Sequence, residues 1–351
     1  MENKRLRAYL VGAAFSALIF PSVVFADIGS IANLSGTVYS KPSGAGKWGV
    51  AVKGSGVNTG DRVKTAGDGR VLLKLDDGTN LTLGNDSELE ITEYLFKKNK
   101  RSAVFSLSSG KVRTAVGKFN GSTDIKVKTP TSVSGVKGTD FIVMNSGPAN
   151  VIFGEESTVQ VSGESGKPVD LKPNTVTENT AGTLPIKPEK VEPGTPLAEA
   201  RAQLETITNV DAPVDWVKAG KLPFMLARWN INYGHYLTES KNFTSALDVL
   251  QIAIDLTDAP ELRAKAHIER GTVLAKNLNE SVKALAEYMT VIDKYSATPS
   301  LPNALYSAGV INKELGKKDE AKRLFERYLT EFPKGSHRGT IEIFMKDMDK
   351  N

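Results

Sequence analysis

Cysteine is absent from all 351 residues of this chain. The protein therefore has no disulfide bond, no thiolate metal ligand, no cysteine nucleophile and no lipidated cysteine of the lipoprotein type. Histidine is scarce as well, because only His235, His267 and His337 occur, and none has the i, i+4 partner that a helical metal site needs. We therefore expect no metal and no cofactor, and we interpret the three histidines as surface residues.

Catalytic patterns are also missing. The glycines at 44, 46 and 49 match GxGxxG, but neither a preceding strand of a βαβ unit nor a following helix supports dinucleotide binding. Asp76 and Asp77 precede a glycine, which favours a turn over a catalytic carboxylate pair. No nucleophile and base recur at a credible spacing, so the sequence predicts that the protein is not an enzyme.

A strong charge of either sign is lacking. The formal net charge is +5, residues 27–180 carry 19 basic and 16 acidic side chains, and the segment from Ala181 onward carries 23 of each. A nucleic-acid-binding domain normally concentrates a strong basic face, so we exclude nucleic acid as a partner. Lys97, Lys98, Lys100 and Arg101 predict a solvated hairpin tip, with contact to phosphate or an acidic glycan as the alternative.

The apolar run from Ala8 to Phe20 is too short to span a bilayer comfortably. It follows three basic residues and ends just before a small-residue cleavage pattern at 24–26, which is typical of a signal peptide. We therefore predict a signal peptide over 1–26, a mature N-terminus at Asp27, no integral membrane span, and a protein of the periplasm or secreted from the cell. A retained anchor is the minority alternative.

From Ile28 to about Thr180, short alternating segments are separated by Gly, Asn and Asp. The predicted strands are Ile31–Tyr39, Arg70–Leu75, Asn80–Leu83, Glu88–Phe96, Ala103–Leu107, Lys111–Thr114, two within Lys126–Val143, then Asn150–Phe153, Thr158–Ser162 and Pro168–Leu171. Asp77-Gly78 predicts a type I′ hairpin turn. Because no long amphipathic helix interrupts the series, this is an all-β module, either a sandwich or a short stack of hairpins.

The stretch Lys126 to Val143 places a Thr-Pro step and then Gly-Thr-Asp-Phe between strands. Phe141 and Val143 should point to one face of the second strand, and Ile142 and Met144 to the other. We interpret Thr129, Gly138, Thr139 and Phe141 as residues that determine the fold only.

These motifs resemble the FecR domain in their order along the chain. They are Trp48, Gly60-Asp61 with Thr65, Asp77-Gly78-Thr79, Ser109-Gly110-Lys111-Val112 and the unit just described. The resemblance covers the whole β-module and implies a periplasmic sensing or scaffolding domain, known from transmembrane regulators that relay an outer-membrane transporter signal to a sigma factor. Because we recognise neither an anti-sigma segment before the apolar run nor a receptor-binding domain after the module, we do not carry sigma regulation over.

Prolines are dense between Thr180 and Pro196, which predicts a semi-extended linker over 181–196. Few apolar residues lie in it, so we expect the two halves of the chain to fold independently. A helix should restart near Leu197, after Thr195-Pro196.

From Leu222 onward the apolar period is helical, and three segments look alike. Gly234, Gly271 and Gly309 recur at spacings of 37 and 38 residues, close to the 34 of a tetratricopeptide repeat. The segments resemble that repeat, and the last places Leu305, Ala308, Gly309, Ala321, Phe325, Tyr328 and Pro333 on its consensus positions. Gly339–Met348 predicts a capping helix. The expected architecture is thus multidomain, with an all-β module over 27–180 and an all-α tetratricopeptide-like solenoid over 197–351.

The expected function is non-enzymatic binding or scaffolding in the cell envelope, through the concave face of the repeats. The partner would be an envelope protein or peptide. Binding of peptidoglycan or another acidic glycan, or signal sensing, by the β-module is the alternative. By repeat position, the predicted partner-binding residues are Arg228, Ile231, His235, Lys265, Ile268, Thr272, Asn303, Tyr306, Val310 and Lys313.

Overall fold

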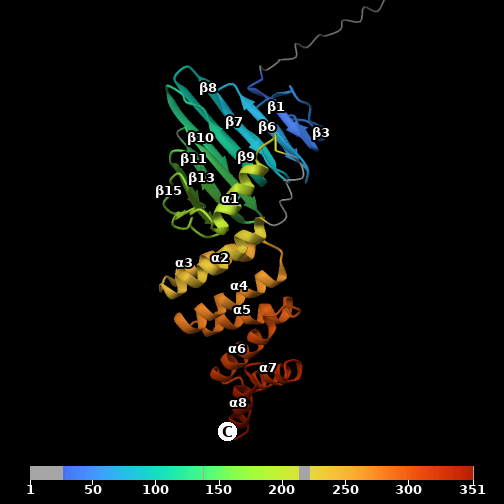
Figure 1. Cartoon of the computed structure of the whole chain (residues 1–351), viewed down its shortest axis with the longest axis vertical. Coiled ribbons are helices and arrows are strands. Elements are labelled where there is room, and N and C mark those ends of the chain that lie inside the picture. The colour runs from blue at the N-terminus through green and yellow to red at the C-terminus, as the bar shows by residue number, and fades with distance from the viewer. Residues whose placement is uncertain (1–26, 137, 213–221, 351) are drawn as a thin grey trace, which may run out of the picture.

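The structure is a computed structural model that describes residues 27–136, 138–212 and 222–350 (Figure 1). The predicted signal peptide, 1–26, lies outside these residues, so its cleavage stays a prediction. Among the described residues, an N-terminal β-module is followed by a column of helices, as the sequence predicts. None of the described helices is both long enough and apolar enough to cross a membrane.

The strands of the described residues run in chain order from β1 to β17. They are β1 Gly29–Ser35, β2 Val38–Lys41, β3 Gly49–Val50, β4 Gly56–Val57, β5 Arg62–Thr65, β6 Arg70–Leu75, β7 Thr79–Leu83, β8 Glu88–Lys97, β9 Lys100–Val116, β10 Ser122–Lys128, β11 Ser132–Val136, β12 Asp140–Ser146, β13 Ala149–Gly154, β14 Val159–Gly163, β15 Val169–Leu171, β16 Thr175–Asn179 and β17 Glu189–Lys190.

They form two sheets that share the long strand β9. Sheet A has the order β4-β1-β6-β7-β9-β12-β13-β16-β17. Sheet B has the order β3-β2-β5-β8-β9-β10-β11-β14-β15. Each of these pairs is antiparallel except β9–β10. The strand β9 passes from one sheet to the other at Gly110, where φ is +94° and a Cβ atom would lie 2.3 Å from the Cα of Ser87.

The main core lies between the sheets, and the module is therefore a sandwich. Leu81 and Val143 of sheet A and Phe105 and Val127 of sheet B belong to this one buried cluster. The outer face of sheet A is apolar too, because Phe153, like Ile142 and Met144, belongs to a second buried cluster. The predicted division of the β12 side chains between two faces is confirmed, since Phe141 and Val143 lie in the first cluster.

Three local details differ from the sequence predictions. The predicted strand Ile31–Tyr39 is split into β1 and β2 at Gly36, whose φ is +68°. In the Asp-Gly hairpin only Gly78 has a positive φ, and its N–H donates to the carbonyl of Leu75, so the turn is not type I′. The polar strand β16 was not predicted at all.

The helices are α1 Pro196–Ile207, α2 Leu222–Glu239, α3 Phe243–Leu256, α4 Pro260–Thr272, the π-helical η3 Val273–Asn277, α5 Ser281–Lys294, α6 Leu301–Glu314, α7 Lys318–Glu331 and α8 Arg338–Lys350. The predicted restart at Thr195-Pro196 is confirmed, because the Thr195 hydroxyl accepts a hydrogen bond from the N–H of Ala198 as an N-cap. From α2 onward, consecutive helices pair as antiparallel hairpins, α2–α3, α4–α5 and α6–α7, with α8 packed on α7.

The segment 181–196 is not the extended spacer that its prolines predict. Within it β17 pairs with β16, and Ile186 is 8% exposed. Beyond it, α1 packs on the outer face of sheet A, followed by α2 and α3, so one buried cluster contains Phe153 of the sheet and Leu204 and Leu226 of the helices. Because the two halves share this buried cluster, we no longer expect them to fold independently. The predicted domain boundaries stay predictions.

Candidate functional site

The first helices of the three hairpins, α2, α4 and α6, each carry a glycine at the crossing with the second helix. A Cβ atom on Gly309 would lie 2.3 Å from Cε1 of Phe325, and one on Gly271 would lie 2.6 Å from Cε1 of Tyr288. Real Cβ atoms do not come this close to other atoms, so only glycine permits the helices to approach as they do. The three glycines that suggested the repeat thus fix its packing.

A cavity of about 420 Å³ opens between the second and third hairpins. Five of the ten predicted partner-binding residues line it, and they come from two different hairpins: Ile268, Thr272, Asn303, Tyr306 and Val310. The sequence placed these side chains together through repeat position alone. Because the cavity combines aliphatic, aromatic and amide or hydroxyl groups, it can accept an apolar side chain and hydrogen-bond the chain that carries it.

The other five predicted residues lie outside this cavity. Arg228 and Lys265 are exposed on α2 and α4, and His235 is exposed and lies 3.3 Å from Glu239. Ile231 is only 2% exposed and belongs to the junction core, so it is not accessible to a partner. The Nζ atom of Lys313 lies 4.6 Å from the ring centroid of Phe344 in α8, so its charge already makes a cation–π contact within the protein.

His337 is a cavity residue that the sequence did not identify. Its ring stacks on Tyr306 with the centroids 3.9 Å apart and the planes 6° apart, and its backbone N–H donates to the hydroxyl of Tyr328. Burial lowers its pKa. The sequence did carry a signal for it, because His337 lies just after the last repeat, where the first helix of a further repeat would begin. Lys276 and Glu314 add one charge of each sign to the lining.

His267 is also more than a surface residue. Its Nδ1 lies 2.6 Å from a carboxylate oxygen of Glu287, and the Nε of Arg270 donates to the other oxygen at 2.9 Å. Burial alone would raise the pKa of Glu287, but the hydrogen bond from His267 and the charge of Arg270 lower it. Arg270 also donates to the carbonyl of Leu247, so this half-buried group links α3, α4 and α5.

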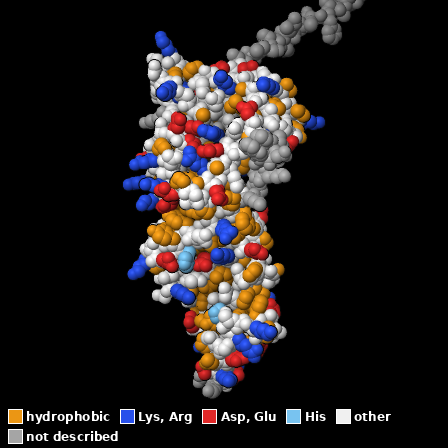
Figure 2. Space-filling model, in the orientation of Figure 1, with side chains coloured by type: hydrophobic (Ala, Val, Ile, Leu, Met, Phe, Trp, Pro, Cys, Tyr) orange, Lys and Arg blue, Asp and Glu red, His pale blue; other side chains and the backbone are white. Residues whose placement is uncertain are grey.

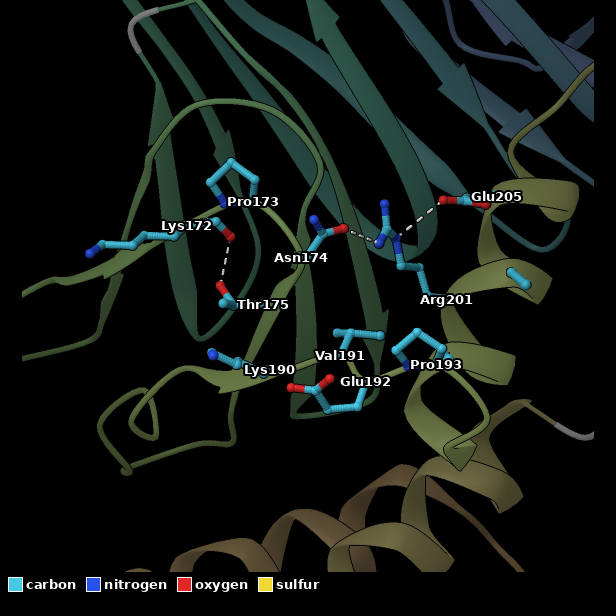
Figure 3. Close-up of a pocket in the computed structure, with 12 residues that line it drawn as sticks. Lys172, Pro173, Asn174, Thr175, Lys190, Val191, Glu192, Pro193, Arg201 and Glu205 are labelled. Atoms are coloured by element: carbon cyan, nitrogen blue, oxygen red, sulfur yellow. Dashed lines mark hydrogen bonds and ion pairs between the residues drawn. The ribbon is translucent and has the colours of Figure 1, made fainter.

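A second cavity, of about 740 Å³, lies at the junction between the end of sheet A and α1 (Figure 3). Arg201 of α1 points into it toward Asn174, with a hydrogen bond of 2.6 Å, and pairs with Glu205 at 3.2 Å. The same guanidinium donates through Nε to Glu155 at 2.9 Å. Because three partners already occupy this arginine, we interpret it as a structural link between α1 and the β-module.

The predicted basic hairpin tip is smaller than expected. Arg101 is 1% exposed, and its guanidinium donates to the carbonyl of Asp77 at 2.9 Å and to the Thr123 hydroxyl at 3.0 Å. Lys97, Lys98 and Lys100 remain exposed. Among the described residues, no cluster of histidine, aspartate or glutamate could hold a metal ion.

Two family models match separate parts of the chain. The family described as "FecR protein" matches residues 61–175, and the family described as "Tetratricopeptide repeat" matches residues 303–335. No curated protein matches this chain. Two crystal structures described as "a putative anti-sigma factor from Parabacteroides distasonis" are similar at 14% identity and a TM-score of 0.34, and each match covers 40% of this chain and 64% of that protein.

The first match begins after β4 and ends at the first residue of β16, so it covers most of the sandwich. The second covers α6 from its third residue, α7 and the turn that leads to the His337 segment. The order of motifs in the sequence predicted both families. The chain therefore contains a FecR domain followed by a tetratricopeptide repeat.

Proposed function

We propose that this protein is a non-enzymatic binding protein of the cell envelope, which holds a protein partner on the face formed by α2, α4 and α6. The observation that carries the proposal is the cavity between α4 and α6, because five residues chosen by repeat position converge on it. Tetratricopeptide repeats offer such a face to peptides and partner helices.

The lining indicates what the partner presents. Ile268 and Val310 are half-buried aliphatic side chains, and the stacked rings of Tyr306 and His337 give a flat wall. We expect a large apolar side chain of the partner to enter here, because deep apolar pockets with aromatic walls supply most of the energy of such interfaces. Asn303 at the rim can hydrogen-bond the partner's backbone.

The experiment is to capture envelope partners by cross-linking and to compare Tyr306→Ala with the matched control Tyr236→Ala. Tyr236 is 60% exposed on α2 and does not line the cavity. We expect Tyr306→Ala to weaken capture by about tenfold or more, the cost of losing one central aromatic contact, and Tyr236→Ala to leave it unchanged. Equal capture by both variants would refute this site.

The charge of the partner is tested separately at Lys265, which is exposed on α4 three residues before the cavity residue Ile268. Lys265→Glu should weaken capture of an acidic or C-terminal-carboxylate partner, while Lys283→Glu on α5 should not. Lys313 is left unchanged in this test because its contact with Phe344 gives it a structural role.

Export to the periplasm is part of the proposal and rests on the sequence of residues 1–26. Mass spectrometry of the envelope fraction should find Asp27 at the N-terminus. An intact Met1 in the inner membrane would instead support a retained anchor. Glycan binding by the β-module remains the alternative, and sedimentation of the protein with peptidoglycan checks it.

A further inference from the structure

The edge of sheet B at β3 exposes a row of apolar side chains. Trp48, Val50 and Val52 are 36%, 75% and 61% exposed, whereas Ala51 between the valines is 6% exposed. Side chains alternate along an extended chain, so the three large side chains share the face opposite to Ala51. Among the described strands β3 pairs only with β2, which leaves its other edge open.

Basic side chains surround this row. Lys47 and Lys53 flank it and are exposed. Across the sheet, Val50 lies opposite Tyr39, which in turn lies opposite Lys64 of β5. The guanidinium of Arg62 stands 5.6 Å from the Trp48 ring, although it also pairs with Glu88. Figure 2 shows hydrophobic and basic side chains side by side at this end of the β-module.

The described chain also begins at this end. Asn58 donates to the carboxylate of Asp27 at 2.8 Å, and Lys53 donates to Asn33 of β1 at 3.3 Å. In the sequence, six residues separate Asp27 from the apolar run Ala8 to Phe20, which we expect to engage a membrane during export.

From these observations we infer that the edge Lys47–Lys53 docks on the surface of an anionic lipid bilayer. Tryptophan favours the interface between headgroups and acyl chains, and the two valines add apolar area at the same depth. Lys47 and Lys53 would meet the negative headgroups, where each basic residue strengthens binding. A second copy of the chain fits less well, because it would bring the same lysines face to face.

Vesicle sedimentation tests the inference on the chain from Asp27 onward, which contains each described strand and helix. The probes are vesicles of phosphatidylcholine alone and vesicles in which phosphatidylglycerol replaces part of it. We expect binding to the anionic vesicles only, weakened by salt. The double variant Val50→Ser, Val52→Ser should bind roughly tenfold more weakly, because two apolar side chains no longer enter the interface.

The matched control is Val282→Ser, since Val282 is 72% exposed on α5, far from this edge in the fold. It should bind as the unaltered chain does. Lys47→Glu with Lys53→Glu supplies a second variant that leaves the valines in place, and it should lose the preference for anionic vesicles. Three results would each overturn the inference. The unaltered chain could bind both vesicle types equally, or the double variant Val50→Ser, Val52→Ser could bind anionic vesicles as strongly as the unaltered chain. The third is a dimer in solution that this double variant abolishes.

Discussion

Glu178 of β16 is a carboxylic acid buried between the sandwich and the helices. It is 0% exposed, and neither carboxyl oxygen has a hydrogen-bond partner among the described residues. Burial raises its pKa to about 8, against a smaller opposing effect of the Asn230 side chain. Asn230 donates to the carbonyl of Leu226, while its own Oδ1 is also without a partner. A protonated Glu178 can donate to that Oδ1, which gives a partner to the amide oxygen and to one of the two carboxyl oxygens.

This raised pKa predicts how stability depends on pH. The unfolded acid titrates near 4.5 and the folded one near 8, so folding takes up a proton between these values. The contribution of Glu178 to stability is therefore fully present below about pH 4.5 and is lost progressively as pH rises toward 8. Glu178→Gln removes this loss, because an amide stays neutral.

We expect Glu178→Gln to raise the free energy of unfolding at pH 7 by up to roughly 3 kcal/mol and to flatten its dependence between pH 5 and 8. Urea denaturation across that range measures both effects. Glu156→Gln, at an exposed position of the same module, is the control and should change little. A variant no more stable than the parent at pH 7 would show that the native carboxyl is charged and paired.

The burial of individual arginines could not be predicted from residue type. Lysines and arginines in a hairpin are usually solvated, so the sequence placed Arg101 at an exposed tip. In the structure Arg101 is buried, and its guanidinium donates to the backbone carbonyl of Asp77. Arg70 is likewise buried, and it donates to the carbonyl of Asn209 after α1. Such contacts join residues far apart in the sequence, and no local pattern reveals them.

At the scale of elements, patterns with a strong period were found and weakly patterned segments were missed. The repeats were recognisable because glycine, alanine and aromatic residues recur where the helices cross. The strand β16 was missed because Thr177, Glu178 and Asn179 are polar although buried, so alternation carries no signal there. Repeat position gave five residues that line one cavity but not the His337 segment, and binding of a partner there stays a prediction.

The crossing of α6 and α7 gives an element-scale prediction. Gly309→Leu should destabilise the last repeat by about 1 to 3 kcal/mol, because even the Cβ atom would overlap Phe325. Hydrogen exchange should rise in α6 and α7 and much less in the sandwich. Gly339→Ala in α8 is the control, since its Cβ atom meets nothing within 4 Å. Unchanged exchange in Gly309→Leu would mean that the two helices do not pack as described.

The whole molecule is held together by the junction core, which contains side chains from both halves of the chain. Hydrogen bonds cross it as well, from the Thr180 hydroxyl to Asp255 at 2.6 Å and from the Tyr233 hydroxyl to Glu189 at 2.6 Å. Composition could not predict this junction, because most of its apolar residues lie in the sheet and the helices, while the proline-rich segment between them adds Ile186 and the partly buried Val191.

Phe153→Ala should therefore weaken both halves at once. Removing this fully buried ring costs about 3 to 5 kcal/mol, and hydrogen exchange should rise in α2 and α3 as well as in sheet A. Phe96→Ala is the matched control, because Phe96 is 44% exposed near the end of β8 and does not belong to the junction core. If α2 and α3 kept full protection in Phe153→Ala, the two halves would be independent, as the sequence first suggested.

The central claim, that a partner binds in the helical array, is tested most directly by photo-cross-linking in intact cells. A photoreactive residue replaces Asn303 at the rim of the cavity, and in a second strain it replaces Gln160 on the exposed face of sheet B. The account predicts a defined cross-linked protein from position 303 and none from position 160. A partner that cross-links from position 160 and not from position 303 would contradict it and move the binding role to the β-module.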